Sequence, residues 1–217
     1  MTKEEKEAKA AAKLQKERER IYAMSEFERK LADKGYICGI DEVGRGPFAG
    51  PVMAGAVILP KDEEILYLND SKKLSAKKRD ELYDIICEKA VAWAVARVEP
   101  ERIDEINILQ ATFEAMREAV SKLTVRPDIL LVDAVHIPEL DIPQESIVKG
   151  DAKSVSIAAA SIVAKVTRDR VMEEYAKEYP GYGFEKNMGY GTAEHREALK
   201  NLGPTPIHRR SFIHNYV

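Results

Sequence analysis

Cysteine and long apolar segments are scarce in this chain of 217 residues. Two cysteines, Cys38 and Cys87, are too few for a disulfide framework, which favours reduced thiols and a cytoplasmic protein. The first residues are charged and lack the apolar core of a signal peptide. No apolar run approaches the ~20 residues that a membrane helix needs, so we expect a soluble protein without membrane contacts.

Net charge is also small. The chain has 34 Lys and Arg against 37 Asp and Glu, a net charge of −3, which argues weakly against a nucleic-acid-binding protein. The charge is uneven, however, because residues 149–217 hold eleven Lys and Arg against eight Asp and Glu. This basic third also contains aromatic residues, and that mixture suits phosphates together with sugars or bases. Its three histidines, which lack metal-ligand spacing and for which we expect structural or surface roles, are His195, His208 and His214.

Hydrophobic periodicity and capping residues predict the order of elements. A Lys/Glu/Arg/Ala-rich helix is expected from residue 3 to about 34, either solvated along the body or gripping nucleic acid, and ended by Gly35. Strands are predicted at 36–43, 52–59, 91–98, 127–133 and 146–148. Helices are predicted from Ser75 to Lys89, after Asn107, from about 155 to 179, and at 193–201. This order indicates a mixed sheet with helices on its faces.

Four carboxylates stand where predicted strands end: Asp41 and Glu42, then Asp133, then Asp151. If they converge, they repel one another and raise each other's pKa unless they share a cation. Oxygen donors without a Cys/His cluster suit Mg²⁺ or Mn²⁺. Neighbours on a strand point to opposite faces, so a bulge or the strand end must aim Asp41 and Glu42 at one ligand. The alternative is that each acid caps a helix or ends a strand separately.

The segment Gly44–Gly50, GRGPFAG, is the second candidate site. It leads into a strand rather than opening a helix, so it does not match the dinucleotide-binding fingerprint. Glycines beside an arginine let backbone approach a ligand closely, and Arg45 can bind phosphate through two hydrogen bonds. An ordinary hairpin loop is the alternative. No P-loop or nucleophile elbow is present in the sequence.

Six motifs together resemble the bacterial ribonuclease HII (type 2 RNase H) family, in the family's order from Gly39 to Phe212. They are GIDEVGRGPFAGPV, NDSKKLS, LLVDA, IVKGDAKSVSIAAASIVAKVTRD, YGFEKNMGYGT and PIHRRSF. The resemblance implies an α/β, RNase H-like fold with a mixed five-stranded sheet flanked by helices. The implied divisions are an N-terminal helical extension (1–35), the catalytic domain (36–180) and a small helical C-terminal segment completing the substrate site (181–217).

The resemblance also implies a metal-dependent endoribonuclease that takes part in ribonucleotide removal from DNA. Such an enzyme hydrolyses the RNA strand of RNA/DNA hybrids and incises duplex DNA 5′ of a single embedded ribonucleotide, leaving 3′-hydroxyl and 5′-phosphate ends. Two Mn²⁺ or Mg²⁺ ions and a monomeric protein are expected. The implied metal ligands and catalytic residues are Asp41, Glu42, Asp133 and Asp151. The implied substrate contacts are Gly44, Arg45, Gly46 and the ribonucleotide-sensing Tyr190, with Lys72, Lys153 and Lys165 as candidate phosphate contacts.

The sequence departs from the family pattern in two places. Met188 stands where many relatives have lysine, and the helix before Tyr36 exceeds the minimal family length. Two alternative functions also remain: a non-catalytic nucleic-acid-binding module, and a related ribonuclease specialised for longer hybrids.

Overall fold

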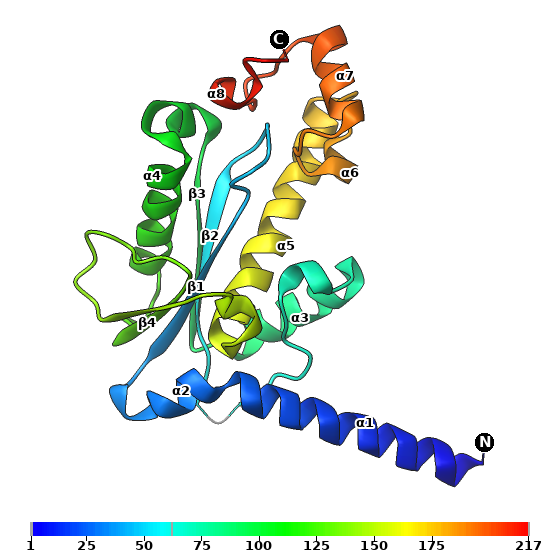
Figure 1. Ribbon diagram of the computed structural model, residues 1–217, viewed down its shortest axis with the longest axis vertical. Coiled ribbons are helices and arrows are strands. Elements are labelled where there is room, and N and C mark those ends of the chain that lie inside the picture. The colour runs from blue at the N-terminus through cyan, green and yellow to red at the C-terminus, as the bar shows by residue number, and fades with distance from the viewer. Residues whose placement is uncertain (1, 62, 217) are drawn as a thin grey trace.

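The computed structural model describes residues 2–61 and 63–216 of the chain (Figure 1). Its strands are β1 (Ile37–Val43), β2 (Val52–Ile58), β3 (Ala92–Val98), β4 (Ile129–Asp133) and β5 (Gln144–Ile147). Its helices are α1 (Lys3–Met24), α2 (Glu26–Lys30), α3 (Ala76–Lys89), α4 (Pro100–Ser121), α5 (Val155–Glu178), α6 (Phe184–Asn187), α7 (Ala193–Leu202) and α8 (Arg210–Ile213). Short 3₁₀ turns are η1 (Ala32–Lys34), η2 (Ser71–Lys73) and η3 (Gly150–Ala152).

The five strands form one mixed sheet in the order β3-β2-β1-β4-β5. β1, β2 and β3 pair antiparallel, whereas β4 pairs parallel to β1 and β5 parallel to β4. The mixed five-stranded sheet is therefore confirmed. The central strand β1 carries Gly39, where an added Cβ would lie 2.0 Å from the carbonyl carbon of Ser156. Glycine here allows the start of α5 to lie directly against the strand that bears Asp41.

Helices cover both faces of the sheet, α4 on one side and α5 with α3 on the other (Figure 1). On the α4 side, Ile40 of β1 belongs to the same apolar cluster as Met116. On the α5 side, Val57 of β2 belongs to a second cluster with Ile162 and Leu82. Helices α6 to α8 form a separate apolar cluster at one end of the molecule, which includes Ala49 from the β1–β2 loop.

A helix does begin after Asn107, as predicted, but it continues a helical segment that was not predicted and that begins at Pro100. Proline's fixed φ suits this first helical position. Asn107 has φ 67° within a kink, and its Oδ1 accepts hydrogen bonds from the N–H groups of Leu109 and Gln110. Its capping interaction is therefore confirmed, but it caps the second half of a longer helix. The fifth strand also lies at Gln144–Ile147 rather than at 146–148.

The predicted N-terminal helix is divided at Ser25 into α1 and α2. The first half of α1 is exposed and projects from the body (Figure 1), and its apolar residue Leu14 is 37% exposed. Only Ile21 and Met24 of α1 are buried. The prediction of a helix lying along the body holds for the last turns of α1 and for α2, where Phe27 and the C-cap residue Leu31 pack against the core.

None of the helices in residues 2–61 and 63–216 combines the length and apolar character required to cross a membrane. The division into 1–35, 36–180 and 181–217 stays a prediction.

Candidate functional site

The structure brings the four predicted carboxylates together from three elements. Asp41 and Glu42 lie on β1, Asp133 ends the adjacent β4, and Asp151 lies in η3. In the parallel β1–β4 pair, Ile40 is opposite Val132, so Asp41 and Asp133 follow side by side. The N–H of Gly150 donates to Asp133 Oδ1 at 2.7 Å, which holds the turn bearing Asp151 against the end of β4.

Burial and mutual repulsion raise the pKa values of these acids. The pKa of Asp41 lies well above its usual range because the side chain is buried and because Glu42 and Asp133 carry like charge. Burial also raises the pKa of Glu42, although Arg45 opposes this rise. The pKa of Asp151 is raised by burial and by nearby acids, including Asp133. A cation shared by the cluster would relieve this repulsion.

The donor set fits a hard divalent cation because it consists of carboxylate oxygens, the ligands that Mg²⁺ and Mn²⁺ favour. No group of three or more His, Cys, Asp or Glu side chains among residues 2–61 and 63–216 is gathered closely enough to hold an ion as it stands. The charge and chemistry of a metal site are thus present, whereas its ligand geometry is not preformed.

The loop between β2 and α3 adds two charged residues beside the carboxylates. Lys72 lowers the pKa of both Glu42 and Asp151, so its ammonium group lies near them, as expected of a residue at the site. Asp70, which sequence reasoning missed, acts oppositely and raises the pKa of Asp151. Asp70 also accepts the N–H of Lys72 at 2.9 Å. The available signal was the motif NDSKKLS, in which Asp70 stands two residues before Lys72.

The glycine–arginine–glycine segment lies next to Tyr190. Gly44 has φ +88°, and a Cβ there would lie 2.3 Å from Arg168 Nε, so the fold itself requires glycine. Gly46 is different, because it is exposed and a Cβ there would meet only Tyr190 Cε1, at 3.7 Å. Tyr190 is 45% exposed. These two residues form an open surface, while the guanidinium of Arg45 lies 3.5 Å from Glu42 Oε1.

Two fully buried arginines, which sequence reasoning missed, hold this surface in place. Arg168 on α5 donates to the carbonyl oxygens of Pro51, Ala49 and Met188 at 2.9–3.2 Å. Arg209 donates to the carbonyl oxygens of Gly44, Arg45 and Gly50 at 2.5–3.0 Å. Burial lowers the pKa of Arg168 to about 10 and that of Arg209 to about 9, so both remain charged at neutral pH. The signal for Arg168 was an arginine on a largely apolar helix face.

The remaining lysines differ in their surroundings. Lys153 is exposed and follows Asp151 in the same turn. Lys165 is mostly buried, and its Nζ donates to Asp169 Oδ1 at 2.6 Å on the same helix. Phosphate binding by either residue stays a prediction.

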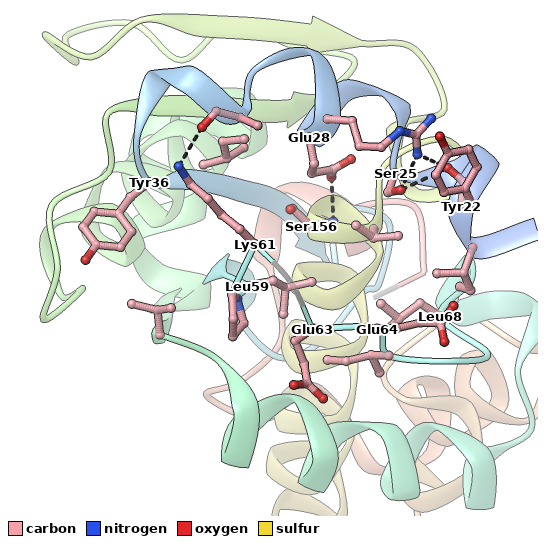
Figure 2. Close-up of a pocket in the computed structure, with 18 of the residues that line it drawn as sticks. Tyr22, Ser25, Glu28, Tyr36, Leu59, Lys61, Glu63, Glu64, Leu68 and Ser156 are labelled. Atoms are coloured by element: carbon pink, nitrogen blue, oxygen red, sulfur yellow. Dashed lines mark hydrogen bonds between the residues drawn. The ribbon is translucent and has the colours of Figure 1, made fainter. Parts of the chain in front are cut away.

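The N-terminal extension reaches the start of α5 through Glu28, beside a pocket of about 720 Å³ (Figure 2). Glu28 Oε1 accepts hydrogen bonds from the Ser154 hydroxyl at 2.5 Å and from the Ser156 N–H at 2.9 Å. Ser154 in turn caps α5, which begins four residues after Asp151. None of the four carboxylates is among the described residues that line the pocket. The extension therefore braces the Asp151 turn, although the pocket itself lies elsewhere.

Comparison with known proteins gives a consistent result. The family model for ribonuclease HII matches residues 38–215. Ribonuclease HII of Lachnoclostridium phytofermentans is 64% identical over 203 residues, which cover 94% of this chain and 80% of the relative. Ribonuclease HII of Clostridioides difficile is 55% identical over 210 residues, covering 96% and 82%. The crystal structure of ribonuclease H2 from Pyrococcus horikoshii has a TM-score of 0.68 at 28% identity, covering 81% and 93%.

Proposed function

Because the chain belongs to the ribonuclease HII family and is an RNase H endonuclease, we propose that it acts on two kinds of nucleic acid. It hydrolyses the RNA strand of RNA/DNA hybrids, and it incises duplex DNA on the 5′ side of a single embedded ribonucleotide, as ribonucleotide removal requires. The observation that carries this proposal is the convergence of four carboxylates near the open surface of Gly46 and Tyr190. We further propose that the protein acts as a monomer.

Enzymes of this family depend on divalent metal ions. Asp41, Glu42, Asp133 and Asp151 would hold two Mn²⁺ or Mg²⁺ ions, with Asp41 contributing to both. Bound divalent ions supply the activation of a water and the stabilisation of the leaving 3′-oxygen. The buried position of Asp41 keeps bulk water from competing for its oxygens, while Lys72 brings positive charge to the same place for the scissile phosphate. The products are 3′-hydroxyl and 5′-phosphate ends.

The ribonucleotide is recognised through its 2′-hydroxyl, the group that distinguishes RNA from DNA at a given site. The exposed backbone of Arg45 and Gly46, with Gly44 before it, contacts that hydroxyl, since no side chain at Gly46 obstructs the approach. The ring of Tyr190 packs on the sugar or the flanking base pair and checks for DNA on the 3′ side. Lys153 and Lys165 are further phosphate contacts in this proposal.

A strand-cleavage assay tests the function directly. Three duplexes of one sequence are compared: all DNA, DNA with one ribonucleotide, and a hybrid with a longer RNA run. With Mn²⁺ or Mg²⁺ we expect cutting of both ribonucleotide-containing substrates, none of the all-DNA duplex, and none with a chelator. Equal cutting of all-DNA duplex contradicts the proposal.

Two other outcomes would favour the alternatives. Tight binding without turnover in any divalent metal would indicate a binding module, for which four central acids offer no advantage in holding phosphates. Cutting of the longer hybrid alone would indicate a ribonuclease specialised for long RNA stretches.

A further inference from the structure

Two histidines with no role in the proposed chemistry meet inside the C-terminal segment. His195 is fully buried on α7, and His208, which precedes α8, is 2% exposed. Their Nε2 atoms lie 2.9 Å apart. Sequence spacing gave no reason to pair them, because they come together only through the loop that follows α7.

The hydrogen bonds around this pair fix the position of each proton. The N–H of Thr205 donates to His208 Nδ1 at 2.9 Å, so that nitrogen carries no proton and the proton of neutral His208 is on Nε2. This Nε2–H of His208 points to His195 Nε2, which must therefore accept the hydrogen bond. The proton of His195 is then on Nδ1, which donates to the carbonyl oxygen of Tyr190 at 2.9 Å. Three hydrogen bonds thus run in one direction, from Thr205 to Tyr190.

This relay requires both rings to be neutral, and the surroundings keep them so. The rings of Phe48, Tyr182 and Phe184 pack around the pair, with Phe184 meeting His195 edge-on at a centroid distance of 5.3 Å. Burial lowers the pKa of His195. Burial, with a smaller electrostatic effect of the neighbouring His195 and Arg210, lowers the pKa of His208 to about 4.

The far end of the relay is the backbone of the proposed ribonucleotide sensor. The carbonyl oxygen of Tyr190 accepts hydrogen bonds from His195 Nδ1 and from the N–H of Thr192. The N–H of Tyr190 donates to the carbonyl oxygen of Asn187. The ring itself is exposed beside Gly46. The placement of the ring against the glycine surface is therefore set from the backbone side.

We propose that the His195–His208 pair positions Tyr190, so that recognition of the ribonucleotide–DNA junction depends on this buried relay. The inference rests on the proposed function of Tyr190. Neither histidine contacts the carboxylates in this arrangement, so both are positioning residues. Loss of the relay is expected to reduce junction selectivity while leaving the metal-dependent step intact.

Two matched glutamine variants separate positioning from general packing. In His195→Gln the amide can replace Nε2 and still meet His208, but nothing replaces the Nδ1–H that reaches Tyr190. In His208→Gln the amide nitrogen replaces Nε2–H and still donates to His195. The measured quantity is the ratio of kcat/KM for the single-ribonucleotide duplex to that for the longer hybrid, alongside thermal unfolding and the metal concentration for half-maximal activity.

We expect His195→Gln to lower this ratio about tenfold through misplacement of the ring, and His208→Gln to change it less than about twofold. In a Tyr190→Ala background, His195→Gln should have no further effect on the ratio. If His195→Gln fails to fold, His208→Leu, which removes the donor to His195, takes its place with the same expected loss.

The outcomes distinguish the inference from the function on which it rests. If Tyr190→Ala lowers the ratio and His195→Gln does not, the positioning role alone is wrong. If Tyr190→Ala keeps the wild-type ratio, the sensing role is wrong and the inference falls with it. If His195→Gln lowers kcat/KM equally for both substrates, and this loss adds to that of Tyr190→Ala, the inference is also overturned. Such a result indicates that His195 contributes only to packing.

Discussion

Asp41 is the acid of the site whose ionised form is most strongly disfavoured by its surroundings. It is 7% exposed, and its pKa is raised by burial and by the charges of Glu42 and Asp133. A carboxylate in such a place costs folding free energy unless a cation compensates for it. Its presence is therefore explained better by metal binding than by stability.

We predict that Asp41→Asn abolishes turnover, by at least about 10²-fold, without loss of the fold. In metal-free buffer its unfolding temperature should equal or exceed that of the wild type, because a repelled charge is removed. Saturating Mn²⁺ should stabilise the wild type by about 2–3 kcal/mol at about 100 times its dissociation constant, and the variant less. Calorimetry with and without Mn²⁺ checks this, with the exposed Asp33→Asn as control. An active variant would rule out the role of Asp41.

The two glycines around Arg45 differ in what they allow. We predict that Gly44→Ala destabilises the protein by about 2 kcal/mol or more, because of its positive φ and the clash with Arg168. Gly46→Ala should keep stability within about 0.5 kcal/mol, yet lower activity about tenfold or more by placing a methyl group where the ribose approaches. Chemical denaturation and initial rates measure the two effects. Wild-type activity in Gly46→Ala would show that this surface does not bind substrate.

Among the elements, the sheet and the long helix α5 could be predicted because their apolar patterns are continuous. The strand ends bearing Asp41, Glu42 and Asp133 follow from the same pattern. The helical segment before Asn107 and the break at Ser25 could not, because tertiary packing decides where a long polar or capped segment begins or bends. Arg168 and Arg209 escaped prediction since their carbonyl partners lie in distant loops.

The role of the N-terminal extension is also explained at this scale, because α2 supplies the Glu28 carboxylate that holds the first turn of α5. We predict that Glu28→Ala destabilises the protein by about 1–2 kcal/mol and raises the metal concentration needed for activity, since the Asp151 turn loses its brace. Denaturant unfolding and a Mn²⁺ activation curve measure both. Glu26→Ala, on the same helix in an exposed pair with Lys30, is the control and should change neither. If Glu28→Ala lowers stability but leaves the Mn²⁺ activation curve unchanged, Glu28 stabilises the fold without positioning the Asp151 turn for metal.

For the whole molecule, the buried histidine pair makes stability dependent on pH. The pKa of His208 falls to about 4 in the folded protein, against about 6.5 when unfolded. Between these two pH values the unfolded state binds a proton at His208 and the native state does not. The stability that neutral His208 contributes above pH 6.5 is therefore lost as the pH falls towards 4. Asp41, with its raised pKa, acts in the opposite direction, so the two contributions must be separated.

Comparison with His208→Gln isolates the histidine. We predict that the wild type loses roughly 2 kcal/mol more stability than this variant between pH 7 and pH 4.5. Denaturant unfolding at both pH values measures the difference. Parallel losses in the two proteins would show that His208 is protonated in the folded state.

The charge distribution over the whole chain has a physical explanation. The small net charge of −3 averages a cluster of acids suited to cations with a basic, aromatic C-terminal third. In the folded protein the acid cluster and the basic C-terminal third lie side by side. The C-terminal segment supplies Tyr190 and Arg209 to the surface of Gly44–Gly46, which follows Glu42. A duplex would thus meet both in one binding event.

Mapping the cut in duplex DNA that contains one ribonucleotide tests this arrangement most directly. The substrate is labelled at either end, and the products are resolved to the nucleotide with their end groups identified. We predict one cut, on the 5′ side of the ribonucleotide, leaving a 3′-hydroxyl on the upstream DNA and a 5′-phosphate on the ribonucleotide. A cut on its 3′ side, or a cyclic phosphate product, would mean that the 2′-hydroxyl itself attacks, and would contradict hydrolysis by a water at the four carboxylates.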